Sequence, residues 1–141
     1  MDIQFKNGKA FIEEVELKNI TESFSTPIYL YSQKIIEDTY RNLNKNLSAE
    51  IFFAVKANSN QAILTLMKNC GAGADVVSAG ELERALQAGF NPDKIIFEGV
   101  GKSKEDIKYA IKKNIRLINV ESIKELNIIN KILKDLNKII N

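Results

Sequence analysis

Lys56 lies in the run IFFAVKAN at positions 51–58 and is the residue best suited to covalent chemistry. We predict a strand over these residues, in which alternate side chains point to opposite faces. The face expected to meet helices is uniformly apolar and holds Ile51, Phe53, Val55 and Ala57. The other face turns polar toward the strand's C-terminal end and holds Phe52, Ala54, Lys56 and Asn58.

Active sites of α/β proteins are built at the C-terminal ends of parallel strands. A lysine there is expected to be partly desolvated, which would make its amine nucleophilic enough for a Schiff base near neutral pH. The small side chain of Ala54 would leave room beside it for a ring. The alternative is a lysine at a strand end that reaches solvent.

Asp75 and Glu81 flank the end of the next predicted strand, where either carboxylate would be able to hold the Lys56 ammonium. A carboxylate inside a buried parallel strand needs a partner, which favours a site role for Asp75. Ser78 and Glu81, however, have the S-x-x-E spacing of a helix capping box. The same spacing at Ser122-Ile123-Lys124-Glu125 is interpreted as capping.

Residues 99–103, GVGKS, form a glycine turn before a predicted helix, and backbone N–H groups in such a turn can bind an anion. The full phosphate-loop spacing is absent, so we favour a tight turn in which Ser103 caps the helix. Asn119 and Glu121 close the fourth strand and could line the same face. Cys70 ends an amphipathic helix and is interpreted as a packed thiol.

Four strand–helix units position these residues. The strands are predicted over 51–58, 74–78, 94–100 and 116–122, and apolar residues at helical spacing follow each one. Strands alternating with helices predict an α/β fold with a parallel sheet. A closed (β/α)8 barrel needs eight such units, so the chain is either about half of a barrel or a small open sheet. Periodicity alone leaves both open.

The first thirty residues are predicted to form short strands, with a hairpin turn at Asn7-Gly8. TPIYLY at 26–31 begins a new unit, and Ser32 is expected to cap a helix after it.

Composition narrows the function class. The 141 residues are 45% hydrophobic and 27% charged, with a formal net charge of +2, which gives no indication of a nucleic-acid or membrane partner. Histidine is absent, so a histidine base is excluded and no metal site is predicted. One cysteine and no stretch of signal or membrane length predict a soluble protein of the cytoplasm.

Several motifs occur together in a characteristic order. TPIYLYS, FFAVKANSN, GADVVSAGELERALQAGF, IIFEGVGKS and INVES resemble the start of the diaminopimelate decarboxylases, in the alanine-racemase-like class of pyridoxal-phosphate enzymes. The similarity runs from about Thr26 to the fourth predicted helix. It implies that the chain is a partial (β/α)8 barrel over 26–141, preceded by a short β segment over 1–25.

The resemblance also implies an activity and a site. Lys56 would carry pyridoxal 5′-phosphate covalently, with Asp75, Glu81 and, in the same motif, Ser78 at the cofactor. The reaction would be α-decarboxylation of meso-2,6-diaminoheptanedioate to L-lysine, the last step of lysine biosynthesis, by a homodimer. Much of the family's barrel and its C-terminal β-domain are not in this sequence, so the 141 residues alone are expected to be inactive.

Two alternatives stay open. An ornithine or arginine decarboxylase would share the lysine motif, because the residues that select the substrate lie mostly downstream. The chain could also be a non-catalytic fragment or small α/β module.

Overall fold

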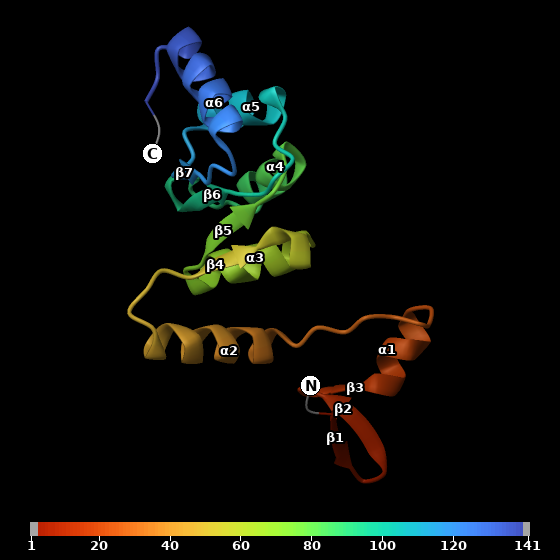
Figure 1. The fold of residues 1–141 in the computed structure, drawn as a ribbon. Helices are drawn as coiled ribbons and strands as arrows, with labels where there is room; N and C mark the ends of the chain where they lie inside the picture. The colour runs from red at the N-terminus through yellow and green to blue at the C-terminus, as the bar shows by residue number, and fades with distance from the viewer. Residues whose placement is uncertain (1–2, 140–141) are drawn as a thin grey trace. The chain divides into compact units, whose positions relative to one another are not determined.

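The computed structural model describes residues 3–139 and divides the chain into two compact units, Met1–Asn46 and Leu47–Asn141 (Figure 1). This division by packing falls later in the chain than the domain boundary predicted after residue 25. That boundary concerns the complete barrel fold and stays a prediction.

The first unit opens with a three-stranded antiparallel sheet of β1 (Ile3–Lys6), β2 (Lys9–Ile12) and β3 (Val15–Glu16). The predicted hairpin is confirmed, with Asn7 and Gly8 both at positive φ, as a two-residue type I′ turn requires. The expectation of strands throughout the first thirty residues is wrong from Leu17, because α1 (Leu17–Ser23) is a helix packed on β2 and β3. Leu17 and Ile20, three residues apart, share one face of it.

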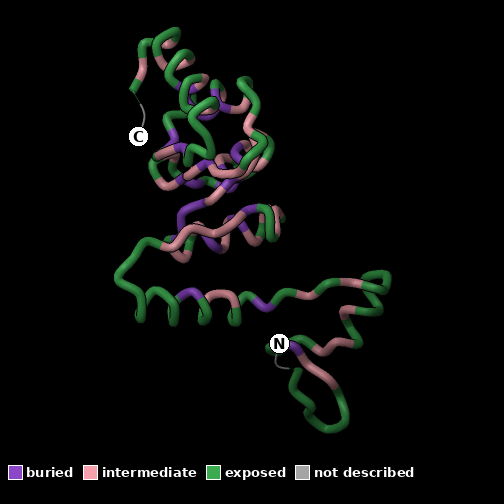
Figure 2. Tube along the Cα trace, viewed as in Figure 1, coloured by how far each residue is buried: buried purple, intermediate pink, exposed green. Residues whose placement is uncertain are grey.

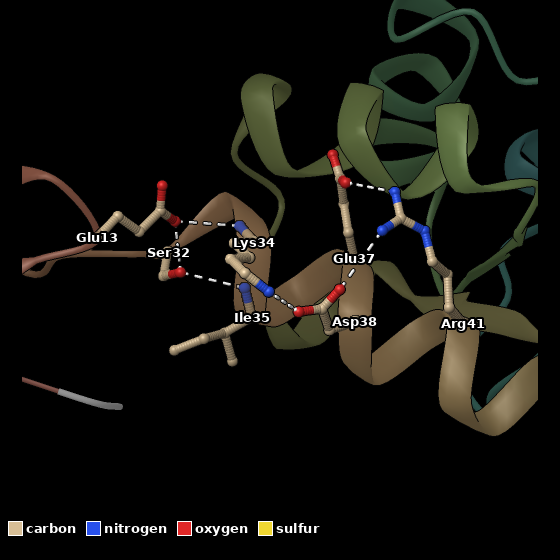
Figure 3. A network of polar contacts seen from close by, with 7 residues as sticks. All are labelled: Glu13, Ser32, Lys34, Ile35, Glu37, Asp38 and Arg41. Atoms are coloured by element: carbon tan, nitrogen blue, oxygen red, sulfur yellow. Dashed lines mark hydrogen bonds and ion pairs between the residues drawn. The ribbon is translucent and has the colours of Figure 1, made fainter.

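Helix α2 (Gln33–Asn46) completes the first unit, and Ser32 caps it as predicted. Glu13, at φ +53° in the turn between β2 and β3, accepts hydrogen bonds from Ser32 Oγ (2.5 Å) and Lys34 N (3.0 Å) (Figure 3). Ser32 Oγ in turn accepts from Ile35 N at 3.1 Å. The small sheet therefore supplies the anion that satisfies the helix N-terminus, where negative charge is favoured.

Glu13→Gln is expected to destabilise the protein at neutral pH and to have little effect in acid. The Ser32 hydroxyl and the Lys34 amide lower the pKa of Glu13, so its contribution is present above the ordinary glutamate pKa and is lost as pH falls through the lowered one. Thermal unfolding at pH 7 and at pH 3 measures the difference. Glu14→Gln, at the exposed neighbour, is the control; equal effects of the two variants at pH 7 would contradict the capping role.

The second unit is a parallel sheet in the order β4-β5-β6-β7, with a helix after each strand (Figure 1). This confirms the four predicted βα units. The strands are β4 (Phe52–Ala54), β5 (Gly73–Val76), β6 (Ile95–Phe97) and β7 (Leu117–Ile118). The α-helices are α3 (Gln61–Cys70), α4 (Ala79–Gln87), α5 (Lys104–Lys113) and α6 (Ile123–Leu136), and the two 3-10 turns are η1 (Val55–Ala57) and η2 (Pro92–Lys94).

The two faces of the parallel sheet differ in burial. Figure 2 shows buried positions gathered along these strands. The strand register places five buried side chains on one face of the sheet: Ala74, Val76, Ile95, Phe97 and Ile118. Burying each large apolar side chain of this set stabilises the fold by about 1.5–3 kcal/mol. The opposite face is only half-buried and holds Ala54, Asp75, Ile96 and Leu117. Polar side chains can therefore lie there, which is where the candidate site begins.

The start of β5 has space only for glycine. A Cβ built on Gly73 would collide with the Phe52 ring and lie 2.7 Å from the Lys94 carbonyl oxygen. Gly73→Ala is therefore expected to cost about 2–3 kcal/mol of unfolding free energy through overpacking. Urea denaturation measures the loss. In the control Gly80→Ala, the nearest atom is Ser78 Oγ at 3.8 Å, and the helix should be unaffected or gain stability. Equal stability of the two variants would contradict this packing.

Candidate active site

Lys56 lies just beyond the C-terminal end of β4, in the 3-10 turn Val55–Ala57. The strand predicted to reach residue 58 ends at Ala54, because the chain turns and Asn58 N donates to Val55 O at 3.1 Å. Strand alternation therefore does not set the direction of Lys56. Val55 is buried as expected, whereas Ala57 is exposed.

The Lys56 ammonium is paired with a glutamate. Its Nζ lies 3.2 Å from Oε1 of Glu98, and its side chain is 55% exposed. More than half of this side chain is accessible, because the turn places Lys56 beyond the end of β4; the expected partial desolvation stays a prediction. The amine is within reach of a ligand and already has an anionic partner.

Asp75 occupies the middle of the half-buried face, registered between Ala54 on β4 and Ile96 on β6. The pKa of Asp75 is raised to about 6, first by burial and then by the hydrogen bond and negative charge of Glu98, while Lys56 acts in the opposite direction. With the carboxyl groups ionised, Asp75 Oδ1 has no hydrogen-bond partner among the described residues. This buried oxygen therefore needs a polar partner, as predicted for a carboxylate inside a buried parallel strand.

Glu98 is a residue of this site that was not predicted from the sequence. It follows β6 directly, and its backbone N–H still donates to Val76 O at 3.0 Å. Its pKa is lowered, first by the hydrogen bond from Lys56 and then by that from Asp75. The available signal was its position two residues after Ile96, which places it on the face of Asp75 at the C-terminal edge of the sheet.

Ser78 caps α4 as predicted, but Glu81 accepts from the N–H of Val77 in place of that of Ser78, so the predicted capping box is incomplete. Ser78 Oγ accepts from Glu81 N at 3.2 Å, and Glu81 Oε2 accepts from Val77 N at 3.0 Å. Their part in holding a cofactor stays a prediction. The charge of Glu81 nevertheless acts on Asp75, whose pKa it raises.

The GVGKS segment is a helix-capping turn, as favoured from the sequence. Ser103 and Asp106 form a complete capping box, and Glu121 Oε1 accepts from Gly99 N at 3.3 Å. The carboxylates of Asp106 and Glu121 thus accept hydrogen bonds from backbone N–H groups that a bound anion would need. The Lys102 side chain is fully buried, with Nζ 2.9 Å from Glu125 Oε1, so this lysine also offers no free charge.

Comparison with known proteins defines the class. A family model described as "Pyridoxal-dependent decarboxylase, pyridoxal binding domain" matches residues 33–141, and the chain belongs to this family. The family membership confirms pyridoxal phosphate as the cofactor.

Three relatives indicate the branch of the family. The chain is 40% identical over 137 residues to the diaminopimelate decarboxylase of Aquifex aeolicus, covering 96% of the chain and 33% of that relative. The structure of diaminopimelate decarboxylase from Helicobacter pylori complexed with L-lysine matches with a TM-score of 0.82 and 40% identity, over 86% of the chain and 32% of that protein. The arginine decarboxylase of Paramecium bursaria Chlorella virus matches with a TM-score of 0.73 and 25% identity, over 82% and 32%.

These matches confirm the α/β fold and the partial (β/α)8 barrel, which a small β segment precedes in the sequence. The chain spans about a third of the length of the curated relatives that it matches.

The described residues fit pyridoxal phosphate. The cofactor's aldehyde needs a primary amine, and Lys56 presents one at the C-terminal edge of the sheet. The buried oxygen of Asp75 and the carboxylate of Glu98 beside it suit a cationic amine.

Proposed function

We propose that the protein containing this chain decarboxylates meso-2,6-diaminoheptanedioate to L-lysine, with Lys56 as the residue that carries pyridoxal 5′-phosphate. The observation that carries the proposal is the accessible amine of Lys56 beyond the C-terminal end of β4, paired with an acid. Membership of the pyridoxal-dependent decarboxylase family and similarity to diaminopimelate decarboxylases support the reaction.

Bound pyridoxal phosphate supplies the electron sink that α-decarboxylation requires. The chain's own residues would anchor the cofactor and orient it. Lys56 would hold the cofactor through its amine, while Asp75 lies on the adjacent strand with a carboxyl group that can carry a proton near pH 6. Ser78 and Glu81 begin α4 at the same edge and are proposed to contact the cofactor. Ala54, at the end of β4, has a small side chain that would leave room for the cofactor ring.

The remaining features of the complete protein are also proposals. Residues 1–25 would belong to its β-domain and 26–141 to the first half of its barrel, and it would act as a cytoplasmic homodimer on a small diamino acid. No helix within residues 3–139 is long and apolar enough to cross a membrane. The 141 residues alone would release no CO₂, because the strands that close the barrel are needed to enclose the cofactor.

A comparison of turnover with three substrates tests the reaction. The full-length protein with pyridoxal phosphate is offered meso-2,6-diaminoheptanedioate, ornithine and arginine in separate assays, and CO₂ and the amine product are measured. We expect CO₂ and L-lysine from the first substrate in large excess over turnover of the others. Preferential release of CO₂ from ornithine or arginine would replace the proposal with the corresponding alternative. The greater identity to the diaminopimelate enzyme, 40% against 25% to the arginine decarboxylase, favours the first result.

A further inference from the structure

Glu98 contacts Lys56 across 42 positions of sequence, and the proposed function uses it only as the acid that pairs with this lysine. Its backbone is fixed at the edge of the sheet by the hydrogen bond to Val76 O. Its side chain is 33% exposed and lies with Oε1 3.2 Å from Lys56 Nζ. A half-buried carboxylate anchored at its backbone can hold a mobile lysine side chain in one place.

Asp75 and Glu98 are direct neighbours on the same face. Two adjacent carboxylates repel each other, so one tends to keep a proton, and the titration belongs to the pair. Protonation of Asp75 creates a donor for Glu98, which accounts for a carboxyl group that otherwise has an unpartnered buried oxygen. Burial favours the neutral form at Asp75, and the nearby ammonium groups of Lys56 and Lys102 favour the anion at Glu98.

We propose that Glu98 is a positioning residue that holds the Lys56 ammonium at the C-terminal edge of β4, and that Asp75 beside it adds a second negative charge as pH rises. The inference deepens the proposed function and rests on its assignment of Lys56.

The charges facing this pair fix the sign of the pH dependence. Lys56 from η1 and Lys102 from the loop after β6 are positive, and Glu81 at the start of α4 is negative. Since the pKa of Asp75 is about 6 and that of Glu98 is lowered, the pair carries one negative charge below about pH 6 and two above it. The electric field at the Lys56 ammonium therefore changes when Asp75 loses its proton.

Side-chain NMR on the full-length protein before cofactor is added tests the inference. The ¹³C carboxyl resonance of Asp75, assigned with Asp75→Asn, is expected to titrate near pH 6, and the ¹⁵Nζ resonance of Lys56 is expected to show a step at the same pH. In Glu98→Gln the Asp75 midpoint should fall by about one pH unit, because the charge and hydrogen bond of Glu98 are removed while burial remains.

Glu50→Gln is the matched control, because Glu50 also pairs with basic side chains, Lys94 and Arg116, but not with Lys56. It should leave both titrations unchanged. An Asp75 midpoint that is the same in wild type and Glu98→Gln would overturn the inference. A wild-type Lys56 resonance without the step would overturn it as well, even if the variant did not fold. Neither readout depends on decarboxylation, so failure of the proposed reaction would be seen separately.

Discussion

Lys56→Ala is expected to reduce CO₂ release by the full-length protein about a thousandfold or more, because the variant has no amine to hold the cofactor's aldehyde at this place. Steady-state decarboxylation with excess pyridoxal phosphate measures the loss. Structure should be retained, because the Lys56 side chain is more than half exposed and makes one ion pair. Loss of activity with a normal thermal unfolding curve would therefore be a chemical effect.

Lys94→Ala is the matched control for Lys56→Ala. Lys94 is also a lysine beside a sheet strand and paired with a glutamate, Glu50 Oε1 at 2.6 Å, but it precedes β6 at the opposite end. Its replacement should leave turnover within about a factor of two, as expected of a partly exposed ion pair. Activity of Lys56→Ala equal to that of the control would contradict the role given to Lys56.

Lys102→Ala is expected to have the largest effect on stability, about 3–5 kcal/mol of unfolding free energy. The Lys102 side chain is fully buried, and its Nζ lies 2.9 Å from Glu125 Oε1, an oxygen with no hydrogen bond among the described residues beyond this ion pair. It also donates to the Gly99 carbonyl and lies 5.9 Å from the centre of the Phe97 ring. Removing Lys102 leaves the Glu125 carboxylate buried without its cation.

A second variant separates the lost charge from the lost packing. Lys102→Met combined with Glu125→Gln removes both charges and keeps the volume, and should recover most of the stability lost in Lys102→Ala. Lys104→Ala, at an exposed lysine two residues further on, should change stability by less than about 0.5 kcal/mol. Urea denaturation of the three variants makes the comparison. A loss in Lys102→Ala no greater than in Lys104→Ala would mean that the pair contributes nothing.

Regular patterns in the sequence were sufficient to predict the parallel sheet. Each predicted strand of the second unit overlaps an observed one, because strand and helix periods and the Ser caps are local signals. The ends of the strands were less predictable. β4 stops at Ala54 although residues 55–58 continue the alternation, since whether a chain turns there depends on contacts outside the strand.

The part of the candidate site that was not predicted depends on contacts between residues that are far apart in the sequence. Lys56 and Asp75 were identified because a lysine or an aspartate within an apolar strand is unusual. Glu98 also lies inside the strand predicted over 94–100, but alternation within that strand does not say which residue of the neighbouring strand it faces. Only the register of β5 and β6 places Glu98 beside Asp75, and the register between two strands cannot be predicted from either strand alone.

Borohydride reduction followed by peptide mapping tests most directly whether Lys56 carries the cofactor. The full-length protein is incubated with pyridoxal phosphate, reduced and digested, and the modified peptide is identified by mass spectrometry. We expect the reduced cofactor on the peptide containing residues 51–58, with no stoichiometric modification in Lys56→Ala. Stoichiometric modification of any other lysine, with Lys56 unmodified, would contradict the account.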